Sequence, residues 1–440
     1  MFKSLRLVNF KAWRDTGEVK LAPVTMLLGA NSSGKSSLIQ SLLLLKQTVQ
    51  SPDPTVHLNL GGDEVNDIFD FGGFHDVLNK NASEAHFEIH CTFDTILRPW
   101  KELPIQYGIR TIRFDGVYGV EKHNSVITDQ IKYSDESKSI AVIREMDGAY
   151  NARIDSDLSS SCKRFPAPTW GGDFSLHEFL LHASGRNELY LFQEFRSFFI
   201  NKLYSVLYLG PLRRKPERVY KWNNKSPGII GNDGNMVMEI LVASDQMRNQ
   251  PYPNPIIHAV SEWLARMQVA EQLEIRQLGS SSHYEVVVRH KNGMIVNLRD
   301  VGIGISQVLP VLTAAYFAPE GSTIILEEPE IHLHPSAQSL LAELFVEVSE
   351  KRNVQFLVET HSEHLFRRMQ TLIAQGRTDN DNVAMYFVER KNDESELRRL
   401  EVDAFGTVKN WPEHFFGDSV GEARAQAMAR AQRMREQAHG

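Results

Sequence analysis

The chain has 440 residues, of which 42% are hydrophobic and 23% charged, with a formal net charge of −7 at pH 7. These values are typical of a globular protein with room for two or three compact units. The negative balance argues against a protein that coats nucleic acid by bulk charge, although a local basic patch stays open. Because Cys91 and Cys162 are the only cysteines, neither a disulfide framework nor a thiolate zinc site is expected.

The N-terminal segment, residues 1–29, alternates apolar and polar side chains around a turn near Asp15 to Gly17. This alternation predicts an antiparallel hairpin that leads into a buried strand. The first ten residues lack the continuous apolar core of a signal peptide, and no apolar run nearby is long enough to cross a bilayer. We therefore expect a cytoplasmic protein.

Residues 29–36, Gly-Ala-Asn-Ser-Ser-Gly-Lys-Ser, match the phosphate-loop pattern G-x-x-x-x-G-K-[ST] at every fixed position. A buried strand precedes the loop and an apolar helix follows it, as the pattern requires. Glycines let the backbone approach phosphates, while successive N–H groups and the helix N-terminus point at the anion. The alternative is a Gly/Ser-rich connecting loop.

This loop predicts a site for ATP and Mg²⁺, with Lys35 neutralising the β- and γ-phosphates and Ser36 ligating the metal. The expected nucleotide-binding residues of the loop are Asn31, Ser32, Ser33, Gly34, Lys35, Ser36 and Ser37.

The middle of the chain changes character twice. Short β-type runs recur between about 84 and 156 and predict an inserted, mostly antiparallel sheet. Residues 175–206 then show helical spacing with an aromatic stripe, which is more often core than a base-stacking platform. Further on, 236–270 have a helical pattern, and 284–298 indicate a hairpin.

A basic stretch lies within this region, where Arg213, Arg214, Lys215 and Arg218 fall within six residues. It is either a solvated turn or a contact with phosphate, of the nucleotide or of a nucleic acid. The sequence leaves both interpretations open.

The last third supplies three more elements. Residues 299–308 place two glycines and a serine before an apolar helical run, which is a second element able to bind an anion.

The strand-type run 323–330 ends in paired carboxylates, and we assign Glu327 to the metal and Glu328 to the general base. A later apolar strand ends at His361, an imidazole suited to the γ-phosphate or to the attacking water. Since ligands bind at the carboxyl ends of strands in open α/β sheets, we expect Lys35, Glu328 and His361 to converge.

The order of these elements resembles the ABC-type ATPase heads of the RecF, SMC and OLD group. More closely, the chain resembles bacterial stand-alone ATPases with a small C-terminal domain of unknown function, the PtuA-like ATPases of anti-phage defence. The segments that resemble this family are 208–213, 300–307, 328–335, 359–364 and 410–416.

The resemblance implies a head-to-head homodimer that encloses two ATP molecules, with Gly304 and Ser306 reaching the nucleotide of the other subunit. An associated effector protein is also implied, and assembly beyond the dimer is left open. Nucleic acid is a further candidate partner. A glutamine equivalent to the transporter Q-loop is not identifiable.

The resemblance also implies the fold class: α/β, an ABC-ATPase-type head of the phosphate-loop NTPase kind with an inserted β-rich and helical region and a short helical C-terminal tail. The head would comprise residues 1–85 and 286–412, the insertion 86–285 and the tail 413–440. The tail has strong helix formers and reads as an exposed helix or a docking helix for a partner.

One alternative site stays open: Glu330, His332, His334, His361 and His364 have spacings found in metal-dependent hydrolases. For function, the leading hypothesis is an ATP-hydrolysing switch that regulates an effector, such as a nuclease, in anti-phage defence. The alternatives are a RecF- or SMC-like DNA-repair ATPase that binds DNA directly and a scaffold that binds ATP without hydrolysis.

Overall fold

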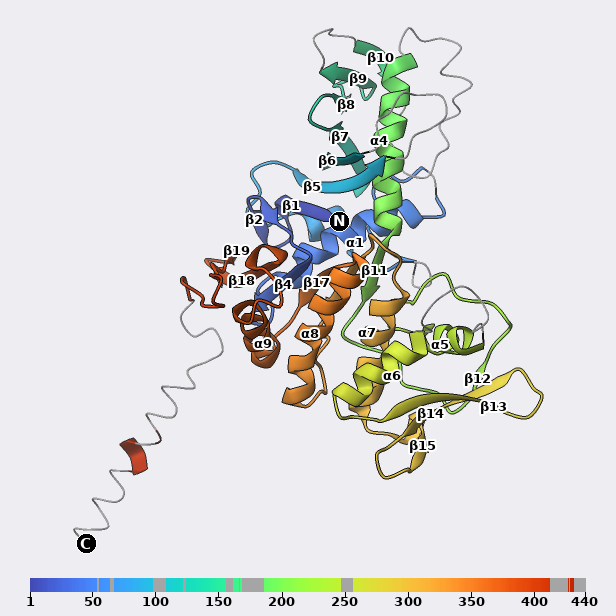
Figure 1. Cartoon of the computed structure of the whole chain (residues 1–440). Coiled ribbons are helices and arrows are strands. Elements are labelled where there is room, and N and C mark those ends of the chain that lie inside the picture. Colours follow the sequence, from blue (N-terminus) through green and yellow to red (C-terminus); the bar gives the residue numbers. More distant parts are fainter. Residues whose placement is uncertain are drawn as a thin grey trace.

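The computed structural model describes residues 1–53, 55–63, 67–97, 108–121, 124–155, 161–165, 167, 186–246, 256–411, 426 and 428–430. Three sheets organise this part of the chain (Figure 1). Within these residues, no helix has both the length and the apolar character needed to cross a membrane.

The central sheet has six strands in the order β11-β16-β17-β4-β18-β19. The first five run parallel, and β19 is antiparallel to β18. Their bounds are Val206–Leu209 for β11, Thr323–Glu327 for β16, Gln355–Glu359 for β17, Val24–Gly29 for β4, Val383–Lys391 for β18 and Glu394–Arg399 for β19. Every residue of β16 and β17 is buried, as expected for parallel strands covered on both faces.

Two hydrophobic clusters cover the two faces of this sheet. On one face, α7 (Ile303–Phe317), α8 (Pro335–Arg352) and α9 (Glu363–Ala374) pack against alternate strand residues such as Met26 and Leu326. On the other face, α1 (Lys35–Gln50) packs against the intervening residues such as Leu27 and Ile325. This alternation follows from the two-residue period of a strand.

The second sheet has nine antiparallel strands and stands above the central sheet in Figure 1. Its path is β10-β9-β8-β7-β6-β5-β1-β2, and β3 pairs with β1. The bounds are Phe2–Phe10 for β1, Trp13–Asp15 for β2, Val19–Lys20 for β3, His86–Leu97 for β5, Gly108–Val120 for β6, Val126–Ser134 for β7, Ser139–Arg144 for β8, Tyr150–Asp155 for β9 and Ser161–Phe165 for β10. The predicted antiparallel sheet between 84 and 156 is therefore confirmed.

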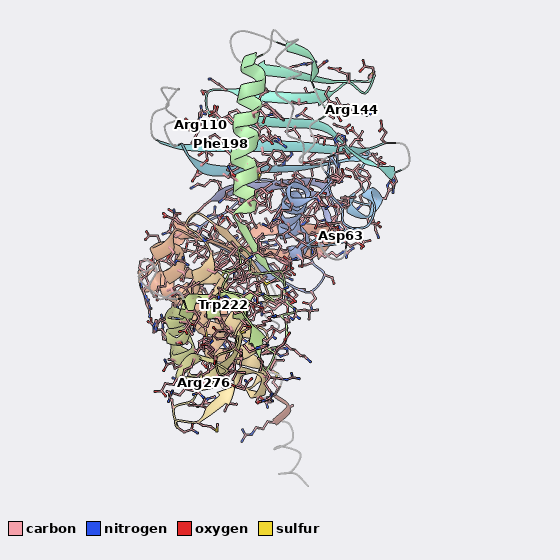
Figure 2. All side chains as sticks on the ribbon, turned by 90° about the vertical axis from the view of Figure 1, so that its right-hand side faces the viewer. Asp63, Arg110, Arg144, Phe198, Trp222 and Arg276 are labelled. Carbon is pink, nitrogen blue, oxygen red and sulfur yellow. The ribbon has the colours of Figure 1, made fainter. Side chains whose placement is uncertain are left out.

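Helix α4 (Arg186–Tyr204) crosses the strands of this sheet, as Figure 2 shows. The aromatic stripe of the predicted helix is core: Phe199 stacks on Phe114 with ring centroids 4.2 Å apart, and Phe192 and Phe195 are also buried. The expected residues before Arg186 lie outside the described part of the chain.

The third sheet is small and lies at the opposite end of the molecule (Figure 1). It contains β12 (Tyr220–Lys221), β13 (Gln272–Gln277), β14 (His283–Arg289) and β15 (Ile295–Asn297). The pairing of β14 with β15 confirms the predicted hairpin. Helices α5 (Val237–Gln246) and α6 (Ile256–Arg266) pack beside it, and short turns form α2 (Phe74–Val77), η2 (Leu298–Asp300) and η3 (Asn380–Asn382).

The proposed domain boundaries stay a prediction, and two pairings bear on them. Strand β11, which falls within 86–285, hydrogen-bonds to β16 in the central sheet. Strand β1, from the N-terminal segment, pairs with β5 in the nine-stranded sheet. The two sheets therefore each contain strands from both sides of residue 85. Most of the expected tail, 413–440, lies outside the described residues.

Candidate nucleotide-binding site

The glycine loop joins the carboxyl end of β4 to the start of α1, and its backbone requires glycine at both ends. Gly29 has φ 141°, and a Cβ there would collide with the carbonyl oxygen of Val388. Gly34 has φ 106°, and a Cβ there would collide with the Ser395 hydroxyl, which donates to the Ser33 carbonyl at 2.6 Å. Both positions exclude a side chain, so the loop can bring its N–H groups close to an anion.

Lys35 begins α1 and is only 2% exposed. Its ammonium donates to the carbonyls of Gly29 at 3.2 Å and Ala30 at 2.7 Å, and lies 3.7 Å from Oε1 of Glu359. Burial lowers the pKa of this ammonium, while the charges of Glu359 and Glu328 oppose that effect. The positive charge is thus fixed at the base of the loop.

The other loop residues differ in what their side chains can offer. Asn31 and Ser32 are exposed at the tip, whereas Ser33 is buried and its hydroxyl has no hydrogen-bond partner. The Ser37 hydroxyl donates to the Gly34 carbonyl at 2.7 Å and accepts from the indole of Trp13 at 3.0 Å. The Ser37 hydroxyl therefore already has hydrogen-bond partners within the protein, whereas the Ser33 hydroxyl has none.

Two carboxylates stand side by side at the ends of β16 and β17, since Glu327 and Glu359 are direct partners in the strand pairing. Both are buried, and Glu327 accepts from the Tyr208 hydroxyl at 3.1 Å. Burial, followed by the charge of Glu359, raises the pKa of Glu327 to about 7. Burial also raises the pKa of Glu359, against the hydrogen bond from Ser36 at 3.0 Å.

Glu359 did not figure among the residues predicted from the sequence. It is the last residue of a buried strand, directly precedes Thr360 and His361, and begins one of the segments that carry the family resemblance, 359–364. Its contact with Ser36 joins positions 323 residues apart.

Glu328 and His361 form the outer part of the site. Nε2 of His361 lies 4.0 Å from Oε1 of Glu328, and both side chains are partly exposed. Burial and the charge of Lys35 lower the pKa of His361, which favours the neutral imidazole at neutral pH. Glu328 has φ 44°, and its backbone N–H donates to the Glu359 carbonyl at 2.8 Å. Lys35, Glu328 and His361 therefore lie together, as the sequence predicted.

Arg213 is buried, so it is not part of a solvated turn, and its contact with phosphate stays a prediction. One nitrogen of its guanidinium donates to the backbone carbonyls of Glu327 at 3.1 Å and Glu328 at 3.4 Å. Burial lowers its pKa to about 10. Sequence reasoning missed this role because a run of charges usually marks a solvated surface. By contrast, Arg214 is exposed and pairs with Glu217 at 3.3 Å.

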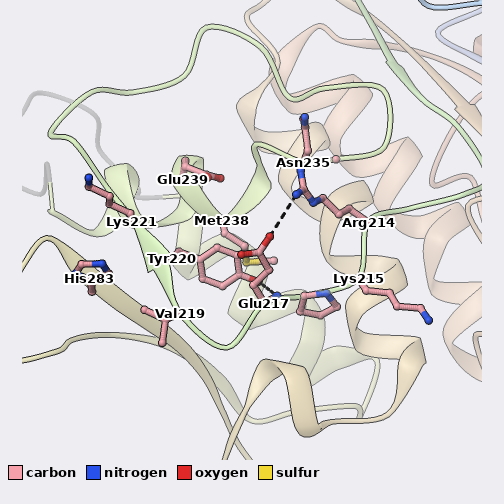
Figure 3. A pocket seen from close by; sticks show the side chains of 12 residues that line it. Arg214, Lys215, Glu217, Val219, Tyr220, Lys221, Asn235, Met238, Glu239 and His283 are labelled. Atoms are coloured by element: carbon pink, nitrogen blue, oxygen red, sulfur yellow. Dashed lines mark hydrogen bonds and ion pairs between the residues drawn. The ribbon is translucent and has the colours of Figure 1, made fainter. Parts of the chain in front are cut away.

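Arg214 also borders a hollow of about 400 Å³ on the side of α5 and β12 (Figure 3). Its lining includes Lys215, Asn235 and Glu239. The hollow lies beside the segment that carries Arg213 and does not include the glycine loop.

The start of α7 holds the two residues expected to act across a dimer. Gly304 packs close to the backbone of His332, whose carbonyl oxygen would lie 3.1 Å from an added Cβ. Ser306 is buried, and its hydroxyl donates to the Ile303 carbonyl at 2.8 Å. Gly302 and Ile303 are exposed. The accessible parts of this helix start are therefore its backbone and the Ile303 side chain, and not the Ser306 hydroxyl.

The alternative histidine cluster has other contacts. Glu330 accepts from the Thr360 hydroxyl at 2.6 Å and from the His361 N–H at 2.8 Å, and His334 caps α8. Among the residues that the structure describes, no group of three or more His, Cys, Asp or Glu side chains is arranged to hold a metal.

The site fits a magnesium nucleotide. A glycine loop with a lysine at the helix N-terminus suits phosphates, and a hydroxyl beside two carboxylates suits Mg²⁺, which needs few protein ligands when phosphates supply others. The unpartnered buried oxygens of Ser33 and Glu359 agree with a polar ligand here. With β4, β16 and β17 parallel and adjacent, this is the α/β fold of a phosphate-loop NTPase, which confirms the fold class.

Comparisons with known families agree with this assignment. A family described as "AAA ATPase domain" matches residues 1–165. One described as "AAA domain, putative AbiEii toxin, Type IV TA system" matches residues 235–367. A third, described as "Protein of unknown function (DUF3696)", matches residues 379–426. The two ATPase-domain matches thus lie on either side of residues 166–234.

An OLD nuclease from Thermus scotoductus is 32% identical over 103 residues, which is 22% of this chain and 19% of the nuclease. The match thus spans about a fifth of that relative. Among solved structures, the SMC head domain from Thermotoga maritima aligns with a TM-score of 0.40 and 13% identity, over 91% of this chain and 99% of that chain. An SMC head bound to the C-winged helix domain of ScpA aligns with a TM-score of 0.46 and 14% identity, over 91% and 98%.

Proposed function

We propose that the protein binds and hydrolyses ATP with Mg²⁺ and that this reaction works as a switch. The observation that supports this most is the meeting of Lys35, Glu328 and His361 at the carboxyl ends of adjacent strands, although they lie far apart in the sequence. Lys35 is suited to phosphate binding, Glu328 to proton transfer and His361 to positioning of water. Together at one place they favour transfer of a phosphoryl group to water.

In this proposal each side chain has one task. Lys35 neutralises the β- and γ-phosphates from the base of the loop. Glu328 accepts a proton from the attacking water as its oxygen bonds to the γ-phosphorus and the bond to ADP breaks. Neutral His361, 4.0 Å from Glu328, orients that water or donates to the γ-phosphate. Ser36 and Glu327 would hold Mg²⁺, which would supply positive charge to the phosphate oxygens.

We also propose that two copies close head to head over the nucleotides. The start of α7 and the segment before Arg213 place exposed apolar side chains beside the Glu328 turn: Ile303 is 51% and Leu212 84% exposed. Such residues are typical of a surface that becomes covered. Because the Ser306 hydroxyl is bonded within its own helix, the free N–H groups of the first turn, at Ile303 and Gly304, would meet the partner's nucleotide.

The test of the ATPase proposal compares wild type with Lys35→Ala and Glu328→Gln. We expect wild type to bind ATP and release phosphate, Lys35→Ala to lose binding, and Glu328→Gln to bind ATP while hydrolysing it about 10²–10⁴-fold more slowly. Absence of ATP binding in wild type would refute the proposal.

For the biological role we propose a cytoplasmic regulator of an associated effector, such as a nuclease, in anti-phage defence. The support is the match to a family whose description names a type IV toxin–antitoxin system, together with the short match to an OLD nuclease. Co-purification of the native protein with its partners tests this, and a recurrent nuclease is the expected result.

The competing role is a DNA-repair ATPase that binds DNA directly. Its specific support is the exposed pair Arg214 and Lys215, which could contact phosphates. ATP-dependent, salt-sensitive DNA binding that is lost when these two residues are neutralised would favour it. Arg213 does not belong in that test because it is buried and bonds to the backbone of Glu327 and Glu328.

A further inference from the structure

Glu359 stands nearer to the glycine loop than Glu327 does, because of the order of the strands. Strand β17 lies between β16 and β4, so Glu359 is one strand away from the strand that leads into the loop and Glu327 is two. Neighbouring strands are about 4.8 Å apart. Glu359 pairs in register with Leu27 of β4, two residues before Gly29. Its carboxylate is therefore the one that reaches the start of α1.

The contacts agree with this placement. The Ser36 hydroxyl, which would ligate Mg²⁺, donates to Oε1 of Glu359 at 3.0 Å. The Lys35 ammonium lies 3.7 Å from the same oxygen. Glu327 instead accepts from Tyr208, on the far side of β16 from the loop. Ser36, which would ligate the metal, and Lys35, which would bind the phosphates, thus both contact the carboxylate of Glu359.

The spacing of the two oxygens suits a common metal. Mg²⁺ binds oxygens at about 2.0–2.1 Å in an octahedron, so neighbouring ligands lie about 2.9 Å apart. The distance from Ser36 Oγ to Glu359 Oε1 is 3.0 Å. Such a pair can turn from a hydrogen bond to shared coordination with little movement of either side chain.

The second oxygen of Glu359 gives independent support. Glu359 is 5% exposed, and its Oε2 is buried without a hydrogen-bond partner in the structure. A buried carboxylate oxygen without a donor is costly, so its retention indicates a partner that arrives with a ligand. A magnesium ion with its bound water supplies positive charge and donors at one place.

We propose that Glu359 is the principal protein carboxylate for the Mg²⁺ of the bound nucleotide, beside Ser36, and that Glu327 is a supporting carboxylate one strand further away. This rests on the proposed ATPase function and deepens it. It moves the metal role from the acid at the end of β16 to the acid at the end of β17. The charge of Glu328 then remains available for the attacking water.

The test measures Mn²⁺ as a substitute for Mg²⁺, by electron paramagnetic resonance, in the presence of a non-hydrolysable ATP analogue. Glu359→Gln should weaken Mn²⁺ binding to the protein–nucleotide complex by about tenfold or more, and Glu327→Gln by clearly less. Glu350→Gln, at an exposed position of α8, is the matched control and should bind Mn²⁺ as wild type does.

A second measurement separates metal binding from folding and from nucleotide binding. With EDTA present, Glu359→Gln should bind the analogue at least as tightly as wild type, because a negative charge near the phosphates has been removed. Its thermal midpoint should not fall. Glu359→Asp, shorter by one methylene, should show an intermediate loss of Mn²⁺ affinity and serves if the glutamine variant unfolds.

Unchanged Mn²⁺ affinity in Glu359→Gln, with a loss in Glu327→Gln, would overturn the assignment while leaving the ATPase proposal intact. A wild-type protein that binds no nucleotide, with or without metal, would overturn both. A Glu359→Gln protein that loses nucleotide binding in EDTA would mark Glu359 as a support for Lys35 and Ser36, and would also overturn the metal assignment.

Discussion

Replacing Arg213 with methionine should destabilise the fold only slightly while it slows ATP hydrolysis. Arg213 is 6% exposed, and its guanidinium anchors the turn after β16 through the carbonyls of Glu327 and Glu328. A charged hydrogen bond of this kind contributes about 1.5–3 kcal/mol, and the second, at 3.4 Å, is the weaker. Two further guanidinium nitrogens are buried without partners, which offsets part of that gain. Methionine fills similar space without that burial cost, so the free energy of unfolding should fall by only about 1–2 kcal/mol.

Arg213→Met should also slow ATP hydrolysis, because Arg213 positions the turn that carries Glu328. Arg213 holds the backbone of Glu328, the proposed general base, in a left-handed conformation with φ 44°. A displacement of about 1 Å at a catalytic group costs about a hundredfold in rate. We therefore expect phosphate release to slow by about 10–100-fold, with ATP affinity within about twofold of wild type.

The assay combines steady-state phosphate release, ATP titration and thermal unfolding. Arg214→Met, which removes the same charge from an exposed neighbour, is the control and should resemble wild type. If Arg213→Met hydrolysed ATP normally, the anchor would have no role in catalysis. If it lost ATP binding and rate in equal measure, Arg213 would be a phosphate contact and the interpretation as an anchor would be wrong.

Three further outcomes are expected. Glu328→Gln should retain ATP binding and form a longer-lived dimer with ATP, visible by sedimentation; a monomer with bound ATP would contradict the switch. Ile303→Arg should prevent that dimer while leaving ATP binding by the monomer unchanged, since the side chain is exposed at the start of α7; a normal dimer would place the interface elsewhere. In the nine-stranded sheet, burial of His90 opposes its charge, but hydrogen bonds to Asp115 at 2.6 Å and Glu88 at 2.7 Å raise its pKa, and both carboxyl pKa values are lowered. The free energy of unfolding of wild type should therefore exceed that of His90→Gln most between about pH 4.5 and 6.5. The difference should shrink as pH rises through the raised His90 pKa and as pH falls through the lowered carboxyl pKa values. A difference in urea unfolding that stays constant from pH 4 to 8 would contradict this.

Local patterns made the centre of the site predictable. The glycine loop, the strand before Glu328 and the strand before His361 each occupy a short, characteristic stretch. The rule that ligands gather at the carboxyl ends of parallel strands then predicted that Lys35, Glu328 and His361 meet. The same local reasoning identified the aromatic stripe of α4 as core, which the stacking of Phe199 on Phe114 confirms.

What the sequence did not reveal depends on strand order and on contacts between distant segments. Local sequence patterns do not determine that β17 lies between β16 and β4 in the sheet, so the approach of Glu359 to Ser36 was not predictable. Arg213 resembled its exposed neighbours because burial is decided by the fold around it, here by the turn at Glu328. Likewise, the Ser306 hydroxyl bonds within its own helix, which spacing alone could not tell.

The central claim is that the glycine loop and the strand ends make one nucleotide site. Calorimetric titration of wild type and Lys35→Ala with ATP and Mg²⁺ tests it most directly. We expect wild type to bind one ATP per chain and Lys35→Ala, which lacks the ammonium buried at the base of the loop, to bind it at least about a hundredfold more weakly. ATP binding of equal strength by both proteins would mean that the nucleotide binds elsewhere.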